Sequence, residues 1–341
     1  MQHPILSKVS RDDWEEASTR QSCTTLPFFL IHRFEKPPPE RPPSECTMSQ
    51  KKSVLLQLDP DIQASTFDAL VAIDAGVDVL LSRSGVQESH VTALVHGLIF
   101  TRGIQDLARS AIFIGGSNLE QGERLAWLVR ETFFGPMRVS VLLDSNGANS
   151  TAAAAVLCCA NHLPLQGAVV GVLGATGPVG QRVARLLLGQ GASVILQSRS
   201  VERCQAVQQS LADWGFDVDR IEVAGPWDQW QRPSLERIQG VIACGAAGAV
   251  LATSRQLENL AQLQVAIDLN AVPPLGLEPI GVMDQGKARG ARHDYGAIGV
   301  GGLKMKIHKA AIRQLFERAD QFLDAEELFQ IGRHIQSASS G

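Results

Sequence analysis

The amino-acid sequence predicts an α/β protein built from two successive α/β domains. Short apolar runs of strand length alternate with amphipathic segments of helix length over most of the chain. A glycine-rich turn near the middle joins one apolar run to an amphipathic segment, as in a strand–turn–helix unit. The length of 341 residues accommodates two domains with sizeable cores.

Net charge, the length of apolar runs and the cysteine pattern exclude several classes of protein. The formal net charge of −4 argues against nucleic acid or an anionic membrane as the main partner. No apolar run approaches the roughly 18 residues that span a bilayer. Six cysteines without a C-x-x-C pair predict reduced, buried thiols in a cytoplasmic protein, rather than a disulfide framework or a zinc site.

Residues 1–47 differ from the rest of the chain. They carry charges without periodicity and a proline cluster at 37–43, which favours extended, unpacked chain. Met48 follows directly and precedes the first strand-like run. We therefore expect residues 1–47 to form a disordered extension and Met48 to be the biological start.

Residues 48–150 are predicted to form the first α/β domain. Polar turns at 101–103 and 115–117 lie at predicted strand ends, where open parallel sheets present ligand sites. Thr101 and Arg102 are therefore candidate substrate-binding residues. The expected strands are 54–58, 78–81, 111–114 and 139–143, and the expected helices are 62–75, 87–95 and 118–132.

A polar loop follows the last of these strands. Asn149, Ser150 and Thr151 precede a run of alanines, which is the pattern of a loop that leads into a capped helix. This helix would lead into the second domain, so the three residues are candidates for a substrate-binding wall of a cleft between the domains. Simple helix capping is the alternative for each residue taken alone.

Residues 151–275 are predicted to form a dinucleotide-binding domain of the Rossmann type. An apolar run at 168–173 is followed by a glycine turn, an amphipathic helix and a second apolar run at 192–196. Glycines in such a turn allow backbone N–H groups to approach a pyrophosphate beside the positive end of the helix. A tight turn without nucleotide is the alternative. The candidate cofactor-binding residues of this turn are Gly174, Thr176, Gly177, Pro178, Val179 and Gly180.

The end of the second apolar run indicates which dinucleotide is bound. An NAD enzyme usually places an acidic residue there to bind the ribose hydroxyls. Here the chain has Ser198, Arg199 and Ser200 instead, and an arginine flanked by hydroxyls suits a 2′-phosphate. We therefore favour NADP and leave additional use of NAD open. A solvated arginine at a strand end is the alternative.

The remaining segments continue the same alternation. Ala246 lies among small residues just past a predicted strand, where backbone can approach a cofactor, and Asn270 ends the next strand; both are candidate cofactor contacts. A glycine loop that runs into a helix is expected at 297–308. The expected helices are 201–213 and 228–237, the expected strands are 221–223, 240–243 and 265–270, and residues 324–327 are expected to cap a last helix.

Several sequence blocks occur together in one known family. In this order and spacing, from Met48 to about Arg333, the chain resembles the methylene-tetrahydromethanopterin dehydrogenases of methylotrophic bacteria. One departure is that the glycine turn reads G-A-T-G-P-V-G from Gly174, where the best-known relatives read G-T-G-P-V-G. The blocks are 56–59, 66–68, 100–103, 133–136, 143–147, 176–180, 270–276 and 299–308.

The resemblance implies an oxidoreductase that transfers a hydride from methylene-tetrahydromethanopterin to NADP, giving the methenyl form, in one-carbon (formaldehyde) metabolism. It implies that the first domain binds the pterin, and that residues 276–341 return to that domain and the cleft. It also implies a cytoplasmic homo-oligomer without metal or flavin, whose partner is a small-molecule pterin and neither nucleic acid nor membrane.

The implied chemistry suggests two catalytic candidates. A carboxylate beside the developing methenyl cation would stabilise it, and Asp68 is our candidate. Lys304 is the candidate for fixing the pterin, and we expect it to pair with an acid because a lone ammonium would oppose the cation. Lys306 could take the place of Lys304, since only one of two residues so spaced should face the cleft. His308 is expected to be a packed or exposed helix residue rather than a base.

Two other functions remain open at this stage. A methylene-tetrahydrofolate dehydrogenase of similar architecture would need the same residue types. A non-catalytic NADP-binding regulator would keep the fold without turnover.

Overall fold

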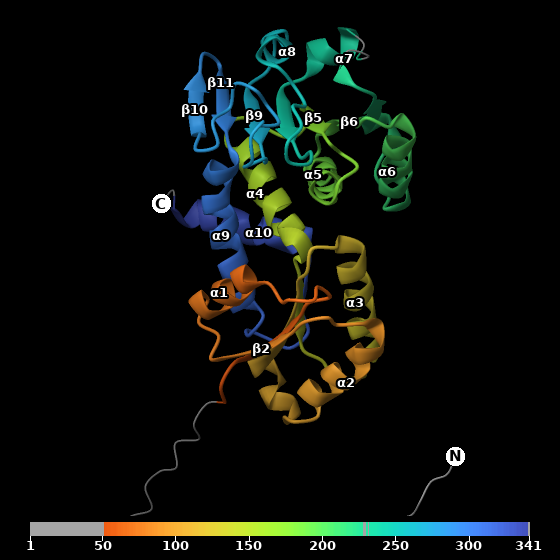
Figure 1. Cartoon of the computed structure of the whole chain (residues 1–341), viewed down its shortest axis with the longest axis vertical. Coiled ribbons are helices and arrows are strands. Elements are labelled where there is room, and N and C mark those ends of the chain that lie inside the picture. The colour runs from red at the N-terminus through yellow and green to blue at the C-terminus, as the bar shows by residue number, and fades with distance from the viewer. Residues whose placement is uncertain (1–50, 228–229, 231, 340–341) are drawn as a thin grey trace, which may run out of the picture. The chain divides into compact units, whose positions relative to one another are not determined.

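The computed structural model describes residues 51–227, 230 and 232–339. The elements discussed below belong to one compact unit, residues 50–341. The extension predicted for residues 1–47 lies outside the described residues. Within the described part, every helix is too short or too polar to cross a membrane. Two β-sheets with helices packed around them form the architecture, which confirms the predicted α/β class (Figure 1).

The first sheet is parallel, with strands in the order β12 (Phe322–Leu323), β4 (Ser140–Leu143), β3 (Ser110–Ile114), β1 (Val54–Leu58) and β2 (Val79–Arg83). From β1 the chain goes to β2 on one side and then crosses to β3 on the other side, so the strand order reverses between β1 and β3. Ligands of open parallel sheets bind at the carboxyl ends of such a strand pair. The sheet geometry therefore predicts where a site should lie.

Helices that pack on this sheet are α1 (Thr66–Asp74), α2 (Glu88–Ile99), α3 (Leu119–Thr132), α4 (Ala148–Ala160) and α9 (Ala297–Gln314). The strands are apolar on both sides because alternate residues point to opposite faces and both faces are covered. Leu56 and Ile112 are buried with apolar residues of α2 and α3, whereas Leu55 and Phe113 are buried with those of α4 and α9. One sheet thus contributes to two hydrophobic clusters.

The second sheet has the strand order β10 (Gln285–Arg289), β11 (Arg292–Tyr295), β9 (Val265–Asp268), β8 (Gly240–Ala243), β5 (Val169–Leu173), β6 (Ser193–Gln197) and β7 (Ile221–Ala224). All neighbours are parallel except β10 and β11. From β11 to β7 this is the doubly wound order of a dinucleotide-binding fold, whose switch point lies between β5 and β8. The sheet confirms the predicted Rossmann-type domain.

The chain after residue 275 is shared between the two sheets. The hairpin β10–β11 was not predicted, and it extends the second sheet to Tyr295, beyond the predicted boundary at 275. Strand β12 then pairs with β4 of the first sheet, so the C-terminal segment does return to the first domain. Between them, α9 packs against α1, α4 and α10 (Ala325–Ser339).

The glycine loop expected at the start of 297–308 is wrong, because α9 already begins at Ala297. A side chain at Gly299 would collide with the backbone of Asp284, so this glycine serves close packing of a helix rather than loop flexibility. The predicted cap of the last helix is confirmed. Asp324 Oδ1 accepts a hydrogen bond from the Ala325 N–H (2.7 Å), and Glu327 Oε2 accepts one from the Asp324 N–H (2.9 Å).

In the second domain, α6 (Val201–Asp213) matches the predicted helix 201–213 at both ends. For the predicted helix 228–237, positions 228, 229 and 231 lie outside the described residues, and α7 covers Arg232–Arg237. The remaining helices of this domain are α5 (Pro178–Gly189) and α8 (Ser254–Glu258).

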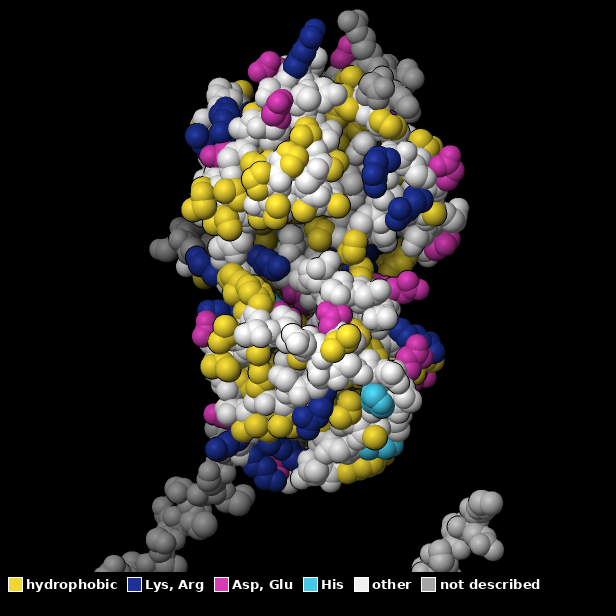
Figure 2. Space-filling model, viewed as in Figure 1, with side chains coloured by type: hydrophobic (Ala, Val, Ile, Leu, Met, Phe, Trp, Pro, Cys, Tyr) yellow, Lys and Arg dark blue, Asp and Glu magenta, His cyan; other side chains and the backbone are white. Residues whose placement is uncertain are grey.

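Charged side chains of both signs are scattered over the molecular surface drawn in Figure 2.

Candidate functional site

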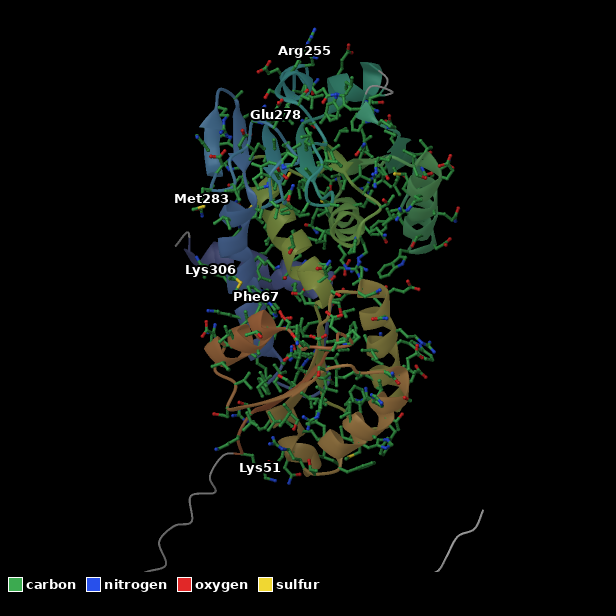
Figure 3. All side chains as sticks on the ribbon, in the orientation of Figure 1. Lys51, Phe67, Arg255, Glu278, Met283 and Lys306 are labelled. Carbon is green, nitrogen blue, oxygen red and sulfur yellow. The ribbon has the colours of Figure 1, made fainter. Side chains whose placement is uncertain are left out.

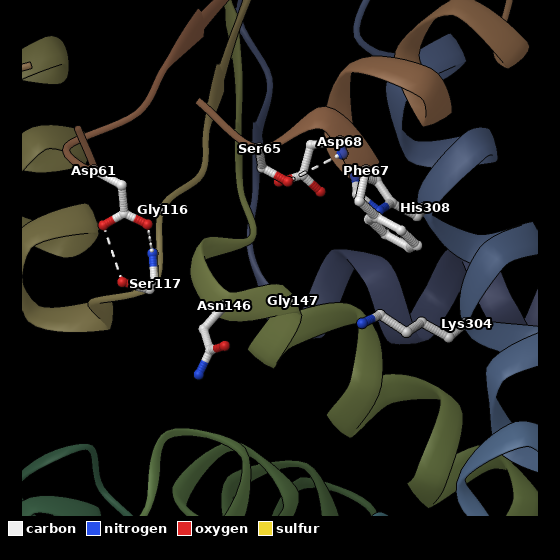
Figure 4. A pocket seen from close by; sticks show the side chains of 10 residues that line it. All are labelled: Asp61, Ser65, Phe67, Asp68, Gly116, Ser117, Asn146, Gly147, Lys304 and His308. Carbon is white, nitrogen blue, oxygen red and sulfur yellow. Dashed lines mark hydrogen bonds between the residues drawn. The ribbon is translucent and has the colours of Figure 1, made fainter. Parts of the chain in front are cut away.

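A cavity of about 260 Å³ lies at the carboxyl edge of the first sheet, beside the switch point between β1 and β3 (Figure 4). Turns that follow β1, β3 and β4 form one side, and side chains of α1 and α9 form the other. The cavity therefore brings together residues that lie more than 240 positions apart in the chain. Its lining residues are Asp61, Ser65, Phe67, Asp68, Gly116, Ser117, Asn146, Gly147, Lys304 and His308.

Buried Asp59, directly after β1, shapes the first turn. Its Oδ1 accepts a hydrogen bond from the Asp61 N–H and its Oδ2 accepts one from the Ser65 N–H, both at 2.9 Å. Asp61 in turn accepts hydrogen bonds at 2.9 Å from the backbone N–H and the hydroxyl of Ser117, after β3. The two turns at the switch point are thus tied together, and α1 starts at a fixed place beside them.

Asp68 lies in the first turn of α1, where the Ser65 hydroxyl caps the helix by accepting from the Asp68 N–H (3.2 Å). Burial raises the pKa of the Asp68 carboxyl above its ordinary value, and the charge of Asp144 adds to the rise. The charges of His308 and Lys304 and a hydrogen bond from Ser65 offset part of it. Whether the Asp68 carboxyl in the cavity is ionised therefore depends on the charges and hydrogen bonds of these neighbouring residues.

Lys304 extends from α9 toward Gly147 (Figure 4). Gly147 has a left-handed backbone (φ 58°), which favours glycine. A side chain at this position would also occupy the space of the Lys304 ammonium. For both reasons the turn after β4 requires glycine. The Lys304 ammonium lies 5.9 Å from the centre of the Phe67 ring.

The predicted pairing of Lys304 with an acid is wrong, because no carboxylate of the described residues forms an ion pair with it within 4.0 Å. Lys306 is exposed and does not line the cavity, so Lys304 is the lysine of this pair that faces the site (Figure 3).

His308, which lines the cavity, forms a buried polar pair with Asp144. The imidazole is 1% exposed and the Asp144 side chain 0%, and Nδ1 lies 3.8 Å from Asp144 Oδ2. Asp144 Oδ1 accepts a hydrogen bond from the Ser150 N–H (3.0 Å), whereas Oδ2 and both ring nitrogens have no hydrogen-bond partner among the described residues. The sequence analysis missed Asp144. Its position directly after a buried strand was the available signal.

The predicted substrate wall 149–151 lies beneath the cavity rather than along it. Asn149 is fully buried, and its amide donates to Leu143 O (2.6 Å) and to Asp324 Oδ1 (2.8 Å). Ser150 is also buried, and the Thr151 hydroxyl donates to Gly147 O (2.5 Å). In this structure the three residues hold the turn after β4 in place, and none of them lines the cavity.

Thr101 and Arg102 are not brought to this site either. They follow α2 and precede β3, so they lie at the amino-terminal edge of the sheet, opposite the cavity. They line a separate hollow of about 380 Å³ with residues of β1, β2 and α2. Arg102 donates a hydrogen bond to Arg109 O (2.7 Å). The sequence shows that a turn is present but not which edge of the sheet it occupies.

The glycine turn after β5 has the form that a pyrophosphate requires. Gly174 has φ +75°, and a side chain on it would approach the backbone of Gly245, after β8, to 2.7 Å. A side chain on Gly180 would approach Gly174 O to 2.6 Å, so glycine permits close packing of α5 on β5. Gly177 caps α5 and Pro178 opens it, which leaves the first N–H groups of the helix free of intrahelical partners. These residues fit the phosphates of a dinucleotide.

The end of β6 lies beside this turn. The hydroxyls of Thr176 and Ser198 are 3.3 Å apart, which links the turn to the strand end. Arg199 is exposed, and Ser200 caps α6 by accepting from the Arg203 N–H (3.2 Å). An exposed arginine between two serines at this position fits a 2′-phosphate.

The other candidate cofactor contacts differ in environment. Ala246 is exposed beyond β8, and Val179 is half-buried in the first turn of α5. Asn270 is buried, and its side chain binds its own loop: Nδ2 donates to Pro274 O and Oδ1 accepts from the Val272 N–H, both at 3.0 Å. The amide of Asn270 therefore shapes the loop after β9.

Comparison with known proteins agrees with this arrangement. Residues 66–146 match a family model described as methylene-tetrahydromethanopterin dehydrogenase, N-terminal. The chain is 38% identical over 286 residues to the Bifunctional protein MdtA of Methylorubrum extorquens, covering 83% of this chain and 99% of that protein. It is 29% identical over 293 residues to the NAD(P)-dependent methylenetetrahydromethanopterin dehydrogenase of the same organism, with coverages of 83% and 99%.

Among solved structures, the ligand-free 5-ketofructose reductase of Gluconobacter sp. strain CHM43 matches with a TM-score of 0.48 and 12% identity, covering 84% of this chain and 99% of that one. The family model spans α1 to the turn after β4, which supplies half of the residues that line the cavity. The sequence relatives extend the match over both sheets. On these findings the chain belongs to the family of methylene-tetrahydromethanopterin dehydrogenases.

Proposed function

We propose that this protein is an NAD(P)-dependent methylene-tetrahydromethanopterin dehydrogenase of one-carbon metabolism, which oxidises the methylene pterin to its methenyl form. The observation that carries the proposal is the cavity at the first switch point, which both Asp68, in the segment that matches the family model, and Lys304, on α9, line. The glycine turn at the second switch point supplies a site for the dinucleotide. Relatives named for a pterin and for NAD(P) support the choice of both ligands.

Three groups of residues would have separate roles in this reaction. Asp68 would face the positive charge that develops on the pterin, and a carboxylate fixed in a partly desolvated cavity stabilises such charge strongly. Lys304 would bind an electron-rich group of the pterin and orient it. Gly174, Gly177 and Gly180 would hold NADP, whose nicotinamide accepts the hydride when it is bound.

The test is a spectrophotometric assay of the purified full chain with methylene-tetrahydromethanopterin and methylene-tetrahydrofolate, each with NADP and NAD. We expect the fastest reduction with the methanopterin substrate and NADP. Faster turnover with the folate substrate would favour a methylene-tetrahydrofolate dehydrogenase. The absence of nucleotide reduction in all four combinations would contradict the proposal and favour an NADP-binding regulator.

Arg199 provides a prediction about nucleotide choice. Arg199→Ala is expected to raise the KM for NADP by roughly 10- to 100-fold, because a charged hydrogen bond contributes about 1.5–3 kcal/mol. The KM for NAD, which lacks the 2′-phosphate, should change little. Arg203→Ala, three residues beyond the N-cap Ser200 and also exposed, is the matched control. Equal weakening of NADP and NAD would remove the phosphate contact from Arg199.

The proposal extends to assembly and location. An exposed apolar face of α1, formed by Phe67, Leu70 and Ile73 with exposed fractions of 52%, 57% and 57%, supports a homo-oligomer. Light scattering of the purified protein should give a mass above that of one chain.

Free cysteines at 158, 159 and 204 support a location in the cytoplasm, where thiols stay reduced. Burial raises the pKa of these three thiols to about 12, 12 and 11. Recovery in a periplasmic fraction would contradict that location.

A further inference from the structure

Helix α5, which starts at the glycine turn, carries two buried arginines that the proposed mechanism does not use. Arg182 and Arg185 are 5% and 8% exposed, and arginine is rarely buried without a partner. Arg185 donates hydrogen bonds to Asp324 Oδ2 (3.2 Å) and Glu326 Oε2 (2.6 Å), and its guanidinium lies 4.4 Å from the centre of the Trp214 ring. Arg182 has a different set of partners, which lie in both domains.

The Arg182 guanidinium contacts three separate elements. Nη1 donates to Pro178 O in the first turn of α5 (3.3 Å), and Nη2 donates to Glu123 Oε1 on α3 (2.5 Å). Nε donates to Asn149 Oδ1 in the first turn of α4. Because a guanidinium is planar and rigid, its contacts fix direction as well as distance. One side chain thus joins the helix of the glycine turn to the helices that follow β3 and β4.

Asn149 continues this connection to the wall of the cavity. Its amide is fully buried, and Nδ2 donates to Leu143 O at the end of β4 (2.6 Å) and to Asp324 Oδ1 (2.8 Å). Oδ1 is therefore left to accept, and Arg182 supplies the donor. With the amide turned over, its NH₂ group would oppose the guanidinium. Arg182 thus fixes the orientation of the amide that holds the turn after β4.

The two ends of this hydrogen-bonded connection are the two proposed ligand sites. Pro178 opens α5 where the phosphates of the dinucleotide fit, and Asn146 and Gly147 line the cavity. We infer that Arg182 is a positioning residue: through Asn149 it holds the glycine turn and the cavity wall at a fixed separation, so that nicotinamide and methylene carbon meet in the orientation that hydride transfer needs. The inference rests on the proposed function for the identity of the two ligands.

The first test needs no turnover: amide hydrogen exchange of the full chain, measured by mass spectrometry with and without NADP. In the unsubstituted protein, NADP should slow exchange at residues 174–180 and, through Arg182, at residues 143–147 beside the other sheet. Arg182→Met should keep the slowing at 174–180 and lose it at 143–147. Slowing at 143–147 that persists in Arg182→Met overturns the inference. Its absence from the unsubstituted protein does the same, even if Arg182→Met fails to fold.

Arg185→Met is the matched control. It removes the same charge from the same helix, three residues further on, where the partners are Asp324 and Glu326 rather than Asn149. Both variants should lower Tm, because each leaves buried carboxylate or amide groups without a donor. Only Arg182→Met should lose the slowing at residues 143–147. Equal loss in both variants would assign the effect to general loosening of α5 and overturn the inference.

Steady-state kinetics separates this inference from the proposed function. Arg182→Met should lower kcat by roughly 10- to 100-fold, because a displacement of about 1 Å between reacting groups has that cost, with little change in the KM of either substrate. If NADP leaves exchange at residues 174–180 unchanged and the unsubstituted protein reduces no nucleotide, the proposed function fails. If the unsubstituted protein is active and Arg182→Met has an equal kcat, the proposed function stands and the role of Arg182 fails.

Discussion

Lys304→Ala is expected to lower kcat by roughly 100- to 1,000-fold, which is the usual cost of removing one fixed polar group that acts in the transition state. Lys304 is the cavity-lining lysine of α9, and Gly147 leaves space for its ammonium. Because no ion pair with a described carboxylate engages it, the ammonium is available to the substrate. NADP should still bind, since the glycine turn belongs to the other sheet.

Lys306→Ala is the matched control for this experiment. The same charge is removed from the same helix, two residues further on, where the side chain is exposed and outside the cavity. Steady-state kinetics with both substrates, together with a fluorescence titration of NADP, would separate turnover from nucleotide binding. Equal rates for the two variants, or a loss of NADP binding in Lys304→Ala, would contradict the assigned role.

The sequence predicted the elements whose local pattern is complete. Strand β1 is an apolar run interrupted by Gln57 and bounded by polar residues, and its limits 54–58 are confirmed. Helix α6 has a serine cap at Ser200 and a glycine after its end, and its limits are also confirmed. In both cases burial, capping and propensity agree, so nearby residues suffice to define the element.

Other features depend on contacts that nearby residues do not encode. The hairpin β10–β11 is largely polar, because β10 forms an edge of the second sheet, and it lacks the apolar alternation of a predicted strand. Gly299 suggested a loop, although its role depends on the backbone of Asp284 lying against α9. Asp144 gains its partner His308 from a helix more than 160 residues away, which no local pattern could show.

Asp68→Asn is expected to lower kcat by about 100-fold, because a neutral amide cannot oppose the positive charge that develops on the pterin. The substitution keeps the size of the side chain and its place in the first turn of α1. The matched control is Asp74→Asn at the other end of the same helix. Asp74 is exposed, and its ion pair with Lys309 is of the surface kind that contributes little to stability.

The pH dependence gives this prediction a second, independent test. Burial raises the pKa of Asp68, so the acid limb of kcat in the unsubstituted enzyme should lie above the ordinary range of an aspartate. The enzyme should lose activity as the pH falls through that value, because protonation removes the charge that the mechanism requires. In Asp68→Asn the residual activity should lose this acid limb, whereas Asp74→Asn should keep it. An unchanged limb in Asp68→Asn would assign the titration to another group, and the carboxylate that faces the cation would then have to be sought at Asp61, the other acid that lines the cavity.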